Sequence, residues 1–165
     1  MEALLIARTD IAKYTSLDGN IDYDKILPFV KTAQDIWIQQ YTGTNLLVKI
    51  KNDILNDTLT GNYLSIVNTF LKPMLIHFTM VEYLPFASFQ ISNQGVNQRT
   101  VENGQVATQE NIQYLTEKYK RIAENYAQRF IDYMNFNNNL FPEYLNNNNE
   151  KINPQQQNYL GGWHI

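Results

Sequence analysis

The two histidines are the side chains best suited to acid–base chemistry near neutral pH, because imidazole titrates there. His77 stands between Ile76 and Phe78 in an apolar stretch, where a hydrogen-bonded histidine of the core or of an interface is the simpler interpretation. His164, the penultimate residue, is interpreted as a contact of the C-terminal segment. Neither belongs to a catalytic motif, and the sequence has no nucleophile elbow, no glycine-rich phosphate loop and no cysteine. We therefore expect no enzymatic activity and no cofactor.

An acidic turn at residues 18–24, DGNIDYD, places side-chain oxygens at alternate positions, as the beginning of a calcium-binding loop does. The pattern then departs from that loop. Tyr23 stands where the loop needs glycine, and Phe29 stands where it needs a bidentate glutamate. A turn followed by a helix cap at Asp22 or Asp24 explains these acids more simply, so we expect no metal site.

Basic residues cluster in the last predicted helix, where Lys118, Lys120 and Arg121 are interleaved with Glu117 and Glu124. This mixture of signs is typical of a solvated helix face. The whole chain carries 13 Lys and Arg against 16 Asp and Glu, a net charge of -3, which disfavours binding of nucleic acid by phosphate neutralisation. A DNA-binding helical protein remains the alternative interpretation, and a small enzyme built around His77 a third.

The length of 165 residues suits one compact domain. The most apolar window, residues 73–89, contains His77, Glu82 and two prolines, and it is shorter than the roughly 20 residues of a spanning helix. The N-terminal residues lack the basic start and the long apolar core of a secretory signal. We therefore expect no membrane contact and no export by that route.

Apolar residues recur at helical spacing, which predicts a mainly α fold, a small bundle of about four to five helices. The expected helices span residues 9–15, 23–41, about 44–60, 62–89 and 109–136. Gly43 should stop the second of these, Pro73 should kink or break the fourth, and Pro85 should end it. Thr108 should cap the last helix, whose predicted buried stripe consists of Ile112, Leu115, Tyr119, Ile122, Tyr126, Phe130 and Tyr133.

Two segments lack the helical period. Residues 90–108 predict a loop or a short β-hairpin insertion, with Gly95 and Gly104 supplying turns. Residues 137–165 are rich in Asn and Gln, and their few large apolar side chains do not offset the entropy cost of ordering the backbone. We therefore expect a helical domain at residues 1–136 and an extended C-terminal arm at residues 137–165 that orders against another molecule. Its candidate interface residues are Leu140, Phe141, Tyr144, Leu145, Tyr159, Leu160, Trp163 and Ile165.

Short motifs in this order give the sequence a resemblance to known proteins. They are LIARTDI at residues 5–11, an acidic turn before a helix with Ala33-Gln34, a YTG stop at residues 41–43, Lys72-Pro73 in the apolar helix, and ISNQGV at residues 91–96 before a long final helix. Over about residues 4–136 the chain resembles the head–tail connector, or adaptor, proteins of tailed bacteriophages. It looks most like the ring proteins of crAss-like phages and of phages of Bacteroidales.

The resemblance implies a non-enzymatic virion protein of the phage neck, assembled in the host cytoplasm. It implies a homo-oligomeric ring, typically of twelve subunits, that docks on the portal protein and offers a platform for other neck or tail proteins. Double-stranded DNA would pass through the central hole without specific recognition. Gly95, Val96 and Arg99 would then supply loop contacts, and the arm would insert residues 140–145 and 159–165 into grooves on a neighbour.

Overall fold

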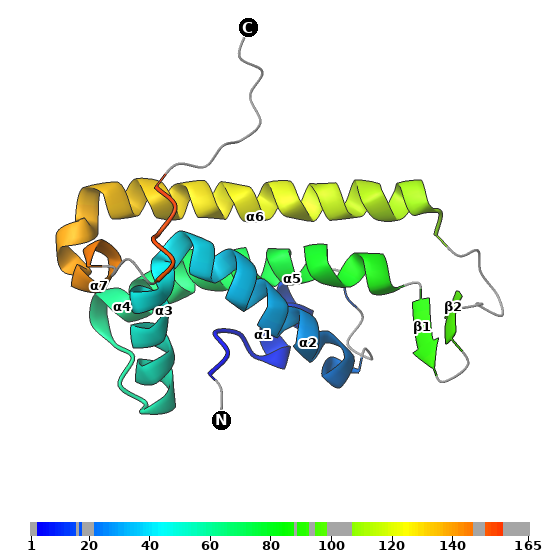
Figure 1. The fold of residues 1–165 in the computed structure, drawn as a ribbon, viewed down its shortest axis with the longest axis horizontal. Coiled ribbons are helices and arrows are strands. Elements are labelled where there is room, and N and C mark those ends of the chain that lie inside the picture. The colour runs from blue at the N-terminus through cyan, green and yellow to red at the C-terminus, as the bar shows by residue number, and fades with distance from the viewer. Residues whose placement is uncertain are drawn as a thin grey trace, which may run out of the picture.

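The computed structural model describes residues 3–15, 17, 22–87, 89–92, 95–98, 107–146 and 151–156. Two long helices, α5 (Lys72–Ala87) and α6 (Gln109–Asn137), lie side by side and run antiparallel, and α2 (Tyr23–Ala33) packs on α5 (Figure 1). Most residues of α5 are apolar, and such a helix is stable in water only when other elements cover it. Leu75, Ile76 and Phe78 are accordingly buried. The expectation of a mainly helical fold is confirmed.

The remaining elements complete the description along the chain. They are α1 (Arg8–Tyr14), the π-helical turn η1 (Gln34–Ile38), α3 (Gln39–Leu55), α4 (Gly61–Ile66), the π-helical turn η2 (Val67–Leu71), β1 (Phe89–Ser92), β2 (Gly95–Gln98), the 3-10 turn η3 (Asn138–Leu140) and α7 (Pro142–Leu145). The two strands pair antiparallel, with Ile91 opposite Val96. They lie beyond the end of α5, next to the beginning of α6 (Figure 1).

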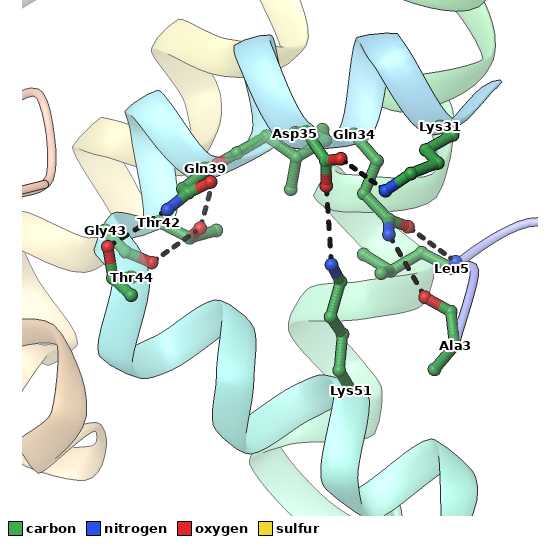
Figure 2. Close-up of polar contacts among 11 residues, drawn as sticks. Ala3, Leu5, Lys31, Gln34, Asp35, Gln39, Thr42, Gly43, Thr44 and Lys51 are labelled. Atoms are coloured by element: carbon green, nitrogen blue, oxygen red, sulfur yellow. Dashed lines mark hydrogen bonds and ion pairs between the residues drawn. The ribbon is translucent and has the colours of Figure 1, made fainter. Parts of the chain in front are cut away.

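Local signals set the boundaries of α2 and α3. The Asp22 carboxylate accepts a hydrogen bond from the Asp24 N–H at 3.2 Å and caps α2. At the other end the helical path breaks at Gly43, whose φ of 72° and ψ of 165° are open only to glycine. Between them, η1 brings Gln34 inward while Asp35 lies between Lys31 and Lys51 (Figure 2). The predicted cap and stop are both confirmed.

Pro73 does not break its helix. The chain stays helical from Gly61 to Ala87 because η2 immediately precedes the proline, and the Lys72 N–H bonds to the Val67 carbonyl five residues back. Pro85 lies inside the last turn of α5, so the prediction that it ends the helix is wrong by two residues. By length and composition residues 61–87 could cross a membrane, but 56% of the most apolar window is buried in the protein, as in many core helices.

The buried face of α6 differs from the predicted stripe. Its fully enclosed residues are Ala123, Ala127, Phe130, Ile131 and Met134, all in the C-terminal half. Small alanine side chains allow α6 to approach α5 closely, so the larger tyrosines flank the contact instead of filling it. The predicted stripe was therefore rotated by about one residue and was too long, and Leu115 is 42% exposed.

The C-terminal segment also corrects an expectation. Phe141 and Tyr144 are buried in the core of their own chain, where Phe141 meets the Tyr63 ring at 5.2 Å. Farther on, Ile152 exchanges two hydrogen bonds with Thr44, at 3.0 and 3.1 Å. The domain therefore continues beyond residue 136. Phe141 and Tyr144 therefore need no neighbouring molecule, because their two aromatic rings fill a site that α3, α4 and α6 leave.

Candidate interaction surfaces

His77 lies against a hollow of about 490 Å³ whose polar lining includes Asp10, Lys72 and Asn68. Its Nδ1 donates to the Pro73 carbonyl at 2.6 Å, which orients the ring, and the ring lies 5.8 Å from that of Tyr126. Burial lowers the pKa of His77 despite the opposing effect of the Pro73 hydrogen bond, so the imidazole is neutral at pH 7.

The hollow does not assemble a catalytic set among the described residues. The Asp10 carboxylate accepts the Ala7 N–H at 2.8 Å and serves the start of α1. No group of three metal-ligating side chains occurs in the part of the chain that the structure describes. His77 is a half-buried residue of α5 whose ring packs against Tyr119 and Tyr126 of α6.

An apolar hollow of about 560 Å³ lies where α5, β1 and the first turns of α6 meet. Its apolar lining consists of Pro85, Phe89, Ala107 and Ile112, and its polar lining consists of Gln109, Gln113, Thr116, Glu117 and Lys120. Phe89 is largely exposed although it is aromatic, and this end of α6 has no buried residue. We call this surface the hairpin-end hollow. Exposed apolar surface of this kind is typical of interaction sites.

A second exposed apolar surface lies at the other end of α6, around η3 and α7. Phe136 is 86% exposed, Leu145 is 53% exposed and Leu140 is 41% exposed. We call these three residues the α7-end patch. Of the predicted arm contacts, Leu140 and Leu145 are thus available to a partner, whereas Phe141 and Tyr144 are occupied within the core.

Other predicted contacts have different outcomes. Gly95 and Val96 lie on β2, opposite Ser92 and Ile91 of β1. Outside the described residues lie Arg99, Tyr159, Leu160, Trp163, His164, Ile165 and Asp18.

A third surface was missed in the sequence. Lys118, Arg121 and Arg129 line one groove of about 620 Å³ on α6, whereas Lys120 lies at the hairpin-end hollow with Glu117 and pairs with Glu124 at 3.9 Å. The helix therefore sorts the mixed charges onto different sides. The sequence contained a signal for this surface: Tyr114, Lys118, Arg121 and Arg129 are separated by four, three and eight residues, which places them on one face of a helix.

The chain is thus a mainly helical protein with exposed apolar and cationic surfaces and no assembled catalytic set among its described residues. Comparison with protein families gives a match over residues 38–154, more than two thirds of the chain, to a family described as "Family of unknown function (DUF6712)". The chain belongs to the DUF6712 family. Neither the curated proteins nor the solved structures yield a match.

Proposed function

We propose that this protein is a structural subunit of a phage virion that forms a ring in the neck, joins the portal to the tail and lets DNA pass through its centre. The resemblance of residues 4–136 to connector proteins supports this proposal. The mainly helical fold, with the strands β1 and β2 between α5 and α6, also supports it. The subunit acts by binding alone, without enzymatic activity or a cofactor.

One observation carries the proposal: different apolar surfaces lie at opposite ends of one long helix. The 29 residues of α6 span about 43 Å, with the hairpin-end hollow near its beginning and the α7-end patch near its end. A contact between two different patches is heterologous, and repetition of such a contact closes into a ring when the rotation between subunits allows it. Twelve subunits are the number that the resemblance implies.

The proposed interface uses the surface that remains exposed after the chain has folded. Leu140 and Leu145 of one subunit contact its neighbour, Gly95, Val96 and Arg99 supply loop contacts, and the arm residues Tyr159, Leu160, Trp163 and Ile165 insert into a groove on a neighbour, the portal or another ring. Phe141 and Tyr144 act differently, by holding α7 against the domain.

The alternative is a DNA-binding helical protein of the packaging machinery, and one observation favours it. The groove that contains Lys118, Arg121 and Arg129 gathers positive charge on one side of α6. A protein of this kind would bind duplex DNA as a monomer or dimer and would not need apolar surfaces at both ends of the helix.

The test is the mass and shape of the purified full-length protein, alone and with the portal protein of the same phage, by light scattering and electron microscopy. We expect rings with a central hole. A variant lacking residues 157–165 and a Leu145→Asp variant should stay folded by circular dichroism but lose the ring. Leu55→Asp, the same change at a 49% exposed position outside both surfaces, is the matched control. Compact monomers or dimers under both conditions would contradict the proposal.

A further inference from the structure

The groove on α6 is built from a face of that helix which no described element covers. Every described residue that lines it belongs to α6, and the set consists of Tyr114, Lys118, Arg121, Ile122, Asn125, Tyr126 and Arg129. Three of these side chains are cationic and none is acidic. Among the described residues, Lys118, Arg121 and Arg129 form no ion pair. We call this surface the α6 cationic groove.

The cations of the groove are spread along a line. Lys118 and Arg121 are separated by about 4.5 Å along the helix axis, and Arg121 and Arg129 by about 12 Å. A single phosphate group could meet Lys118 and Arg121 together but would not reach Arg129, whereas a chain of phosphates would meet all three. The line therefore fits a polymeric anion.

The side chains of the groove are partly held in place before any ligand binds. The Arg129 guanidinium lies 5.5 Å from the centre of the Tyr126 ring and 5.9 Å from that of Phe70. Such contacts with aromatic rings restrict the arginine at little cost to its hydrogen-bonding capacity. The edges of its planar fork remain suited to paired hydrogen bonds with phosphate oxygens.

Two other occupants fit less well. A second copy packed two-fold on this face would bring Lys118, Arg121 and Arg129 against their own counterparts, which like charges oppose. An acidic protein helix would bury its own apolar face here, but Ile122 is the single aliphatic residue in the described lining. Phosphates need no apolar partner.

We propose that the α6 cationic groove contacts the phosphate backbone of duplex DNA, without recognising base sequence. The inference goes beyond the proposed ring and stands without it, because the contact requires only one chain. The net charge of -3 keeps the binding weak, and the local segregation of charge on α6 directs it to this face.

The experiment measures fluorescence anisotropy of two labelled 30-base-pair duplexes of unrelated sequence with the full-length protein, between 25 and 200 mM NaCl. We expect equal affinity for both duplexes and a logarithmic salt slope of about -2.7, from three phosphate contacts. The variant Lys118→Gln with Arg121→Gln should bind about tenfold more weakly or worse at 50 mM NaCl, with a slope smaller by about 2.

The matched control is Lys25→Gln with Lys31→Gln, which removes the same charge from exposed positions on α2, outside the groove and outside both apolar surfaces. This control should retain most of the wild-type affinity, and thermal melts should show that both variants fold. Equal loss in the control, or no binding at 25 mM NaCl, overturns the inference. So does a groove variant that loses binding to poly-glutamate but not to DNA, since the partner is then an acidic protein. Ring formation, scored separately by microscopy, shows whether the connector proposal fails independently.

Discussion

The buried side-chain amide of Gln34 is hydrogen-bonded to the backbone around Leu5 through both of its polar atoms. Its Oε1 accepts the Leu5 N–H at 2.9 Å, and its Nε2 donates to the Ala3 carbonyl at 3.1 Å (Figure 2). The N-terminal segment thereby gains for its backbone the partners that a sheet would have supplied. Gln34 is the first residue of the π-helical turn η1, so its side chain links that turn to the N-terminal segment.

Replacement of Gln34 by Met should therefore destabilise the protein strongly. Met is of similar size but pairs with neither backbone group, and each buried group left unpaired costs about 1–3 kcal/mol. We expect the free energy of unfolding in urea to fall by about 2–4 kcal/mol. Gln113→Met, at an exposed position, is the control and should change it by less than about 0.5 kcal/mol. Equal stability of the two variants would show that the amide contributes nothing.

Features governed by neighbouring residues were predictable from the sequence. The cap at Asp22, the stop at Gly43 and the cap at Thr108, which accepts the Asn111 N–H at 3.3 Å, each follow from local backbone chemistry. The continuous helix through Pro73 was not predictable in this way. Its π-helical turn shifts the hydrogen bonds upstream of the proline, and such turns have no clear sequence signal.

The surfaces were predicted less well than the helices, because the position of a surface depends on which face of each helix is buried in the core. Ala123 and Ala127 are weak signals in the sequence, yet they set the rotation of α6 and so place Lys118 and Arg121 together, away from Lys120. Burial of Phe141 was missed for a related reason. Whether an aromatic ring in a polar segment is exposed or buried depends on whether helices distant in the sequence form a site that accommodates it.

Phe141→Ala provides a direct test of the corrected C-terminal segment. The ring is fully buried and lies 5.2 Å from that of Tyr63, so its removal leaves a cavity between α4 and α7. The expected loss of unfolding free energy is about 3–5 kcal/mol, measured by chemical denaturation. Phe136→Ala removes an exposed ring of the same kind and should cost less than about 0.5 kcal/mol. A small effect of Phe141→Ala would instead support the original expectation that this segment does not pack on its own chain.

Gly43→Ala should be more damaging than the same change at Gly61. Gly43 is buried with φ 72° and ψ 165°, a conformation almost closed to other residues, and strain of this kind costs about 1–3 kcal/mol. Gly61 also has a positive φ, 58°, but no atom lies within 4 Å of the position that a Cβ would take. Thermal melts should therefore show the larger decrease in Tm for Gly43→Ala. A reversed order would place the strain elsewhere.

The pH dependence of stability tests the environment of His77. Burial, opposed by the Pro73 hydrogen bond, lowers the pKa of the folded state below the value of 6.5 that the unfolded chain has, so the unfolded state binds a proton first on acidification. The contribution of His77 to stability is thus present above pH 6.5 and is lost as the pH falls through the lowered pKa.

Unfolding in urea at pH 7.5 and at several values down to pH 5 should reveal this contribution as a difference between wild type and His77→Gln. Both proteins share the carboxylates that titrate in acid, so their difference isolates the imidazole. We expect the wild type to lose more stability than the variant on acidification across this range, and the two curves to run parallel above pH 7. Parallel curves throughout would mean that His77 takes up its proton equally well in the folded and unfolded chain, and would contradict the lowered pKa.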